Sequence, residues 1–179
     1  MDKDELGRLY PVYLSDYDTN WPVLFSKEKG ILKSIFSADL KIEHIGSTAV
    51  EGLSAKPTID ILIEKPHGMD DEEIINKMAG NGYIHMKEQD SHLMFVKGYS
   101  PAGLEKESYH IHMGPLDQDW LWDRIYFRNY LIHNNSEARI YEKLKKEYAL
   151  NYRYDREAYT DAKAEYIKMI TEKAKSELQ

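Results

Sequence analysis

The order of the predicted elements constrains the fold of this chain more than any other feature: strand-like segments precede Pro115, and helix-forming segments follow it. Strands are expected at 40–46, 57–64, 83–87, 92–99 and 108–114, and helices at 21–36, 70–79, 119–133, 136–150 and 158–175. Strands that come first and helices that come last are typical of the α+β class. The length favours one domain over residues 1–179, with a mixed sheet, helices packed on it and a C-terminal helical segment.

Charge and residue content exclude several kinds of function. The formal net charge of −7 argues against general binding to nucleic acid, which depends largely on Lys and Arg at phosphates. The chain has no cysteine, so any metal must be held by oxygen or imidazole. No run approaches the ~18 apolar residues of a membrane span, and the N-terminal segment MDKDELGRLY lacks an apolar signal region. We expect a cytoplasmic protein without a membrane or nucleic-acid partner, and its oligomeric state stays open.

The first candidate site is Gly46-Ser47-Thr48, which ends the first expected strand. Backbone N–H groups of a turn or short helix, together with two hydroxyl groups, could hold a phosphate there. Alternatively, Ser47 or Thr48 only caps the following turn. The segment is not a P-loop, because no Lys follows a second Gly at the spacing of G-x-x-x-x-G-K-[ST].

Asp60 is the most informative acid, because it lies within the apolar strand segment TIDILIE. Side chains alternate along a strand, so Asp60 and Leu62 share one face and the isoleucines point to the other. A carboxylate between isoleucines is costly to bury unless it is paired or bound to metal. Asp60 is therefore either part of a functional site or bonded to Lys56, His44 or a turn amide on a partly exposed face.

The second constellation is the pair His110 and His112, in the segment YHIHM. In a strand they share a face and lie roughly 7 Å apart, where they could approach one metal ion or phosphate. Alternatively, one histidine is hydrogen-bonded in the sheet and the other is exposed. Histidine triad hydrolases use a related alternation, but position 114 here is Gly rather than a third histidine.

Basic residues on the expected helices are further candidates. Arg128 and Lys163 could bind phosphate, and Arg suits bidentate contacts to phosphate oxygens. A solvated or ion-paired role is the alternative for each of them.

Together, these segments resemble the GrpB family, which belongs to the nucleotidyltransferase superfamily. The matching segments are YDTNWPVLF at 17–25, IEHIGSTAVEGLSAKPTIDILI at 42–63, HIHM at 110–113, FRNYL at 127–131, YEKLKKEYAL at 141–150 and YTDAKAEYI at 159–167. They extend in order over most of the chain, and the central block is long and specific. The resemblance implies a nucleotidyltransferase-like mixed sheet with helices packed on it.

The resemblance also implies roles for the candidate residues. In nucleotidyltransferases a Gly-Ser after the first core strand contacts nucleotide phosphates, so Gly46 and Ser47 would face Asp60 across one cleft, with Thr48 beside them. Lys56 and the helical Arg128 and Lys163 would neutralise the remaining phosphate charge. Acids on the next strands hold a divalent metal, so Mg²⁺ or Mn²⁺ would bind at Asp60 and His112, and Asp60, His110 and His112 would carry the chemistry.

The sequence also departs from the pattern of the superfamily. An active nucleotidyltransferase usually has a D-x-D or D-x-E pair, and here the partner of Asp60 is Leu62. Glu64 or the two histidines would have to substitute for the second acid. Glu51 stands where the family pattern V-P-G-L has Pro, and Asn129 stands where F-R-D has Asp.

Three functions with a nucleotide or other phosphate ligand therefore stay open. The first is a metal-dependent nucleotidyltransferase, and the second is a binding module that keeps the fold and the phosphate cleft without turnover. The third is a metal-dependent phosphoester hydrolase that uses His110 and His112. The missing second acid favours the binding module, whereas the clustering of Asp60, Lys56 and the histidine pair favours chemistry.

Overall fold

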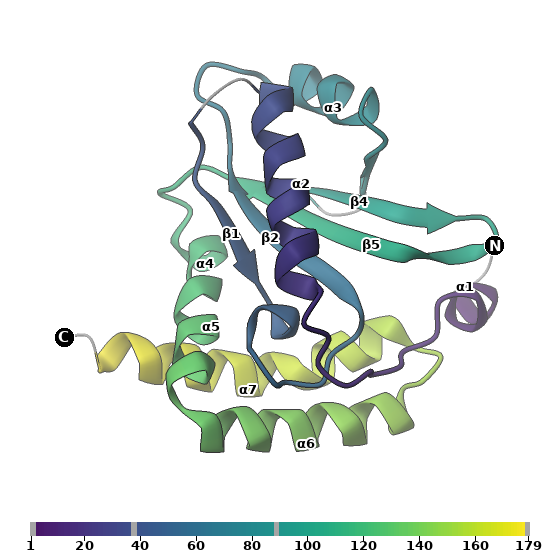
Figure 1. Cartoon of the computed structure of the whole chain (residues 1–179), viewed down its shortest axis with the longest axis vertical. Helices are drawn as coiled ribbons and strands as arrows, with labels where there is room; N and C mark the ends of the chain where they lie inside the picture. The colour runs from purple at the N-terminus through teal and green to yellow at the C-terminus, as the bar shows by residue number, and fades with distance from the viewer. Residues whose placement is uncertain (1–2, 37–38, 88–89, 178–179) are drawn as a thin grey trace.

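The computed structural model describes residues 3–36, 39–87 and 90–177 (Figure 1). Within these residues, the centre of the fold is a five-stranded mixed sheet in the order β1-β2-β5-β4-β3. The strands are β1 (Ile42–Ile45), β2 (Thr58–Glu64), β3 (Ile84–His85), β4 (Leu93–Ser100) and β5 (Gly103–Gly114). Helices pack on this sheet, so the predicted α+β class with a mixed sheet is confirmed.

The pairing of the strands aligns the candidate residues in one row. β1 runs antiparallel to β2, with Ile45 opposite Asp60, and β2 runs parallel to β5, with Asp60 opposite His110. β4 pairs antiparallel with both β5 and β3. Because Gly46 directly follows Ile45, the turn after β1 starts beside Asp60.

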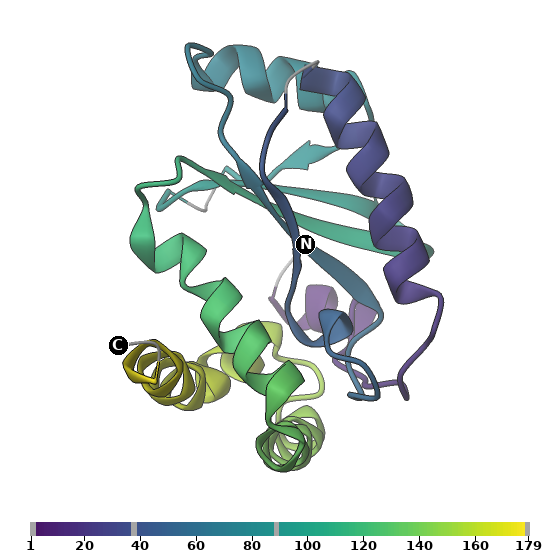
Figure 2. The same cartoon turned by 60° about the vertical axis from the view of Figure 1, so that its left-hand side comes forward.

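One face of the sheet is covered by α2 (Trp21–Phe36) and α3 (Asp71–Ala79), as Figures 1 and 2 show. The isoleucines of β2 point to this face, in a buried cluster with Leu32 of α2 and Ile74 of α3. Burying these apolar side chains supplies the main favourable free energy of this layer. The predicted alternation of β2 is confirmed, because its isoleucines and Leu62 lie in different clusters.

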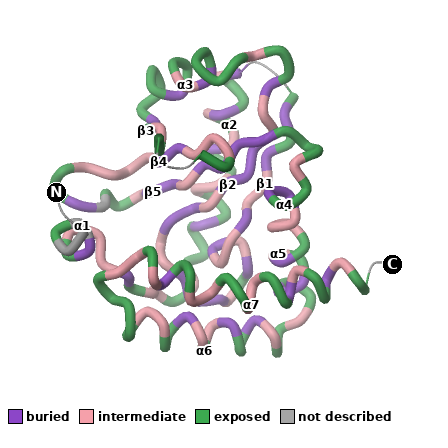
Figure 3. The backbone as a smooth tube through the Cα atoms, turned by 180° about the vertical axis from the view of Figure 1, so that it is seen from behind, coloured by how far each residue is buried: buried purple, intermediate pink, exposed green. Residues whose placement is uncertain are grey.

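The C-terminal helices lie on the other side of the sheet (Figure 2). They are α4 (Asp119–Trp122), α5 (Arg124–His133), α6 (Asn135–Asn151) and α7 (Arg156–Ser176). Leu62 of β2 packs here against Leu121 and Trp122 of α4. In Figure 3, buried and exposed residues alternate along α6 and α7, as expected for helices with one face on the protein interior. None of the described helices is long and apolar enough to cross a membrane.

The structure differs from the prediction at four elements. The strand expected at 83–87 is only Ile84–His85. A short N-terminal helix, α1 (Lys3–Leu9), was not expected. The helix expected at 119–133 is divided at Asp123, which ends α4 and precedes α5. β5 begins at Gly103 rather than 108, because the charged segment GLEKE continues the hairpin with β4. That segment lacks an apolar alternation, so only the backbone hydrogen bonds of the hairpin make it a strand.

Candidate functional site

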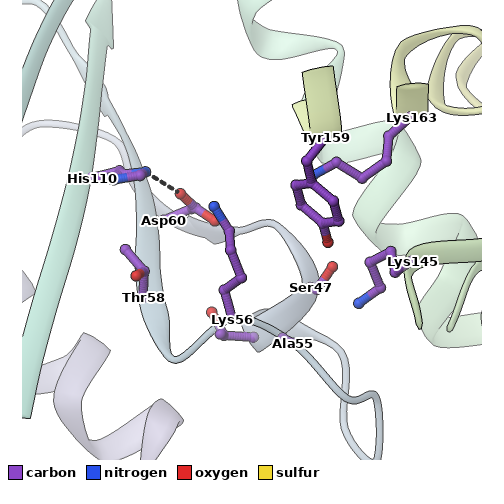
Figure 4. A pocket seen from close by; sticks show the side chains of 10 residues that line it. Ser47, Ala55, Lys56, Thr58, Asp60, His110, Lys145, Tyr159 and Lys163 are labelled. Carbon is purple, nitrogen blue, oxygen red and sulfur yellow. Dashed lines mark ion pairs between the residues drawn. The ribbon is translucent and has the colours of Figure 1, made fainter. Parts of the chain in front are cut away.

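A small pocket lies where β2 and β5 meet α6 and α7, and its volume is about 50 Å³. It is lined by Ser47, Thr48, Ala55, Lys56, Thr58, Asp60, His110, Lys145, Tyr159 and Lys163. Figure 4 shows the side chains of Asp60 and Lys56 on one side of the pocket and those of Tyr159 and Lys163 on the other. Residues that are distant in the sequence therefore share one polar space.

Gly46 brings the turn after β1 close to Asp60. Its φ of 73° and ψ of −173° belong to a region that is essentially restricted to glycine. A Cβ atom at position 46 would lie 2.6 Å from Asp60 Oδ2, so a side chain would displace the carboxylate. The short 3-10 helix Ser47–Ala49 follows and has no side-chain cap, so the turn is not explained by capping alone.

The two hydroxyl residues of this turn have different surroundings. Thr48 is 1% exposed, and its Oγ1 lies 2.9 Å from Nε2 of His44. Burial lowers the pKa of His44 to about 4, so this imidazole is neutral near pH 7. Thr48 is thus held in place by His44, and Ser47 is the more available hydroxyl group in the turn.

Asp60 begins a chain of hydrogen-bonded side chains. His110 Nδ1 lies 3.2 Å from Asp60 Oδ1, His110 Nε2 lies 2.6 Å from the Tyr99 hydroxyl, and Arg156 Nη2 donates to that hydroxyl at 3.2 Å. Burial would raise the pKa of Asp60, but the hydrogen bond from His110 and the nearby positive charges outweigh it and hold this pKa well below its usual range. With Asp60 ionised, His110 Nδ1 donates to it, and the other ring nitrogen of His110 lies within hydrogen-bond distance of the Tyr99 hydroxyl.

Three lysines from separate elements line the pocket with this carboxylate, and Asp60 acts on the charge of Lys56 and Lys163. Lys56 precedes β2, Lys145 lies on α6 and Lys163 lies on α7. Lys145 is 1% exposed and donates to the Ser54 carbonyl group, and the Lys163 ammonium lies 4.0 Å from the centre of the Tyr159 ring. Within the described part of the chain, none of the three forms an ion pair with a carboxylate.

The surroundings of these three lysines lower their pKa values. Burial is the main cause that lowers the pKa of Lys56 and Lys145 to about 7, and that of Lys163 to about 8. Positive charges nearby lower these values further: Arg156 acts on both Lys56 and Lys163. Three lysines with lowered pKa values line one pocket, and an anion bound there would favour their charged forms.

Most of the predicted site residues come together. Ser47, Thr48, Lys56, Asp60, His110 and Lys163 line the pocket, and Gly46 lies against Asp60. Gly46 and Ser47 thus face Asp60, as the resemblance implied.

Arg128 and His112 are not among the lining residues. Arg128 Nη1 donates to Glu43 Oε2 at 2.7 Å and to the His44 carbonyl oxygen at 2.8 Å, which is the ion-paired alternative. His112 is 8% exposed, and its Nδ1 lies 2.8 Å from Nε2 of His92. Register explains its position, because His112 pairs with Leu62 rather than with Asp60.

Sequence reasoning missed Lys145 and Tyr159 in the pocket and Tyr99 and Arg156 behind His110. Lys145 follows Tyr141 by one helical turn, and its ammonium lies 5.1 Å from the centre of that ring. The segment YEKLKKEYAL alternates in charge as a solvated helix face does, which concealed a buried lysine. No signal in the sequence connects Tyr99 with Arg156.

The residues present do not fit the expected divalent metal site. Mg²⁺ requires a near-octahedral set of oxygen ligands, usually with more than one carboxylate or phosphate. Asp60 contributes one carboxylate that already accepts a hydrogen bond from His110, and Leu62 is fully buried where a second acid would lie. Over residues 3–36, 39–87 and 90–177, no group of three His, Cys, Asp or Glu side chains is placed to hold a metal ion.

This chain is similar to known proteins along most of its length. Residues 11–173 match the family model described as "GrpB protein". The UPF0157 protein PA4798 of Pseudomonas aeruginosa is 38% identical over 161 residues, which are 88% of this chain and 65% of that protein. The chain thus spans less than two thirds of the length of this relative.

Solved structures support the fold. The crystal structure of conserved protein GrpB from Enterococcus faecalis is 29% identical, with a TM-score of 0.80 over 93% of this chain and all of that chain. The Cid1 poly(U) polymerase, solved with Mg 3′-dATP bound, gives a TM-score of 0.54 at 12% identity, over 83% of this chain and 49% of that chain. The second likeness concerns the fold alone, and the fold of this chain is nucleotidyltransferase-like.

Proposed function

The chain belongs to the GrpB family, and from this premise we propose that its pocket binds the phosphate group of a nucleotide or of another phosphorylated small molecule. The charge of the pocket carries the proposal: three lysine ammonium groups and several hydroxyl groups surround a single carboxylate. Ammonium and hydroxyl groups donate hydrogen bonds, and phosphate oxygens accept them, so a phosphate complements this lining.

The lining residues supply donors from two sides of the phosphate. The turn at Ser47 offers its hydroxyl and backbone N–H groups, while Lys56 and Lys163 supply positive charge. Tyr159 extends from α7 with its hydroxyl directed toward Ser47 (Figure 4). His110, which also contacts the Tyr99 hydroxyl, orients Asp60 at the edge of this space.

Among the three functions left open, binding without nucleotidyl transfer fits this geometry best. Transfer in this superfamily needs metal-holding acids, and Asp60 has no acidic partner at Leu62. A hydrolase that uses His110 and His112 together is disfavoured, because His110 bonds Asp60 and Tyr99 while His112 bonds His92. A role for Mg²⁺ or Mn²⁺ stays a prediction that rests on the resemblance.

Calorimetric titration with each nucleoside triphosphate, with and without Mg²⁺ or Mn²⁺, tests this proposal directly. We expect saturable binding by the wild-type chain and roughly 10- to 100-fold weaker binding by Lys163→Met, because a charged hydrogen-bond donor is lost. Lys168→Met is the matched control, since Lys168 lies on the same helix with its side chain 77% exposed, and its affinity should equal that of the wild type.

Two outcomes contradict the proposal. A folded protein that binds no nucleotide, phosphate or pyrophosphate would show that the pocket has another ligand. Equal weakening by Lys163→Met and Lys168→Met would place the bound anion outside the pocket. If chromatography of the products shows that pyrophosphate is released from any triphosphate, the protein is an active transferase rather than a binding module.

A further inference from the structure

We infer that the ammonium groups of Lys56, Lys145 and Lys163 take the place of a divalent cation in this pocket, so that it binds a compact phosphoryl or pyrophosphoryl group directly. This inference rests on the proposed function and adds the class of ligand and the way its charge is balanced. Its starting point is that the residues lining the pocket do not form the divalent metal site that a nucleotidyltransferase-like fold would suggest.

The balance of charge in the pocket is the first argument. A metal-dependent site places carboxylates together so that a divalent ion can neutralise them. Here the proportion is reversed, since three lysines line the pocket together with the single carboxylate of Asp60. A divalent cation among these amines would be repelled, whereas an anion with two or more charges would be attracted. The chain as a whole carries a charge of −7, so this cationic cluster is a local feature.

The second argument concerns the two positions of β2 that follow Asp60 on the same face, Leu62 and Glu64. Leu62 is fully buried between the sheet and Trp122, so its side chain belongs to the hydrophobic core. Glu64, the next residue on that face, accepts from the backbone N–H of Lys41 at 3.0 Å with its Oε2. Both positions are thus occupied by contacts that do not involve the pocket.

The size of the pocket limits the ligand. An engineered protein cavity of about 150 Å³ binds benzene, and this pocket offers only about 50 Å³. The space therefore suits a single phosphoryl group between Ser47 and Lys163, and any nucleoside attached to it would lie outside. We expect inorganic phosphate and pyrophosphate to account for most of the binding free energy of a larger ligand.

Binding should also change the protonation of the lysines. In the empty pocket burial lowers their pKa values to about 7–8, and a bound anion raises them again because it favours the charged form. The charged groups that act on these amines are Asp60 from β2, Arg156 from α7, Glu142 and Lys146 from α6, and the three lysines themselves. Near pH 8, phosphate binding should therefore be accompanied by proton uptake.

The test is calorimetry with inorganic phosphate and with pyrophosphate, in excess EDTA and again with Mg²⁺, near pH 8. We expect pyrophosphate to bind in EDTA at least as tightly as with Mg²⁺, with proton uptake that appears as different heats in buffers of different ionisation enthalpy. Lys56→Met and Lys163→Met should each weaken binding roughly 10- to 100-fold, and Lys163→Arg should restore much of it. Lys168→Met should have no effect.

Each other outcome overturns the inference in a recognisable way. Binding that requires Mg²⁺ would overturn it while leaving the proposed phosphate function intact. No binding in either condition would overturn both. Binding in EDTA that Lys56→Met and Lys163→Met leave unchanged would place the anion elsewhere on the chain. Circular dichroism of each variant shows that a loss of affinity is not a loss of fold.

Discussion

Gly46 shows how one residue sets the geometry of the site. It follows the last residue of β1, which pairs with Asp60, and its backbone conformation is one that other residues rarely adopt. The absence of a side chain lets the Ser47 turn approach the Asp60 carboxylate without displacing it. A specific backbone conformation therefore brings the hydroxyl groups of this turn into the pocket that Asp60 lines.

Gly46→Ala should damage both stability and binding. The backbone conformation alone costs about 1–3 kcal/mol for a residue with a Cβ atom, and the new Cβ would lie 2.6 Å from Asp60 Oδ2. Urea unfolding would measure the first effect, and pyrophosphate titration the second. Gly68→Ala is the control, because Gly68 also has a positive φ, of 77°, but open space around its Cβ position. If the two variants lose equal stability and both bind normally, Gly46 does not shape the site.

Among the C-terminal helices, α7 contributes most of the side chains that line the pocket. It carries Tyr159 and Lys163 into the lining and Arg156 to the Tyr99 hydroxyl. Asp155 caps its first turn, with Oδ1 accepting from the Ala158 N–H at 3.0 Å. The cap therefore fixes the beginning of the helix on which the pocket depends.

Asp155→Ala should remove this cap and lower the free energy of unfolding by about 0.5–2 kcal/mol. Fraying of the first turn displaces Tyr159, so pyrophosphate should bind more weakly. Asp155→Asn keeps a capping side chain and should retain most of both properties. Asp70→Ala removes the equivalent cap of α3, where Asp70 Oδ1 accepts from the Glu73 N–H at 2.8 Å. That control should lose similar stability in thermal unfolding while its affinity stays normal, and equal affinities for Asp155→Ala and Asp70→Ala would contradict the role of α7.

For the whole molecule, buried lysines make stability depend on pH. Burial lowers the pKa of Lys56 and Lys145 from 10.5 to about 7, so between these values the unfolded chain holds protons that the folded chain has released. Unfolding therefore takes up protons, and the free energy of unfolding increases as the pH rises through this window. Above pH 10 the sign reverses, because burial raises the pKa of Tyr141 and Tyr159 and the unfolded chain ionises first.

Urea unfolding at a series of pH values should show stability rising from about pH 7 toward pH 10 and then falling. Each lysine that titrates in this window contributes up to about 1.4 kcal/mol per pH unit. Lys145→Met should make the slope shallower, and saturating pyrophosphate should do the same in the wild type, because it keeps the amines protonated in the folded state. A slope that Lys145→Met leaves unchanged would mean that Lys145 is not the source of the effect.

The sequence predicted the local parts of this protein. The alternation in TIDILIE fixed the two faces of β2, and the apolar spacing of residues 21–36 predicted α2. The turn at Gly46 and the places of Asp60 and His110 on neighbouring strands also followed from residue type and position. The α1 helix, the break at Asp123 and the first residues of β5 did not, because tertiary contacts rather than local pattern stabilise them.

The lysine cluster was decided by tertiary structure alone. The cluster combines Lys56 from a loop, Lys145 from α6 and Lys163 from α7. A lysine looks the same in the sequence whether its ammonium group is solvated or buried in the folded chain. Packing of α6 and α7 beside the turn at Ser47 buries Lys145 fully and Lys56 and Lys163 in part, and brings all three lysines into one pocket. The charge of a pocket depends on distance and burial, which a linear pattern does not contain, so only the folded chain could suggest an anion site in place of the metal site that the family resemblance implied.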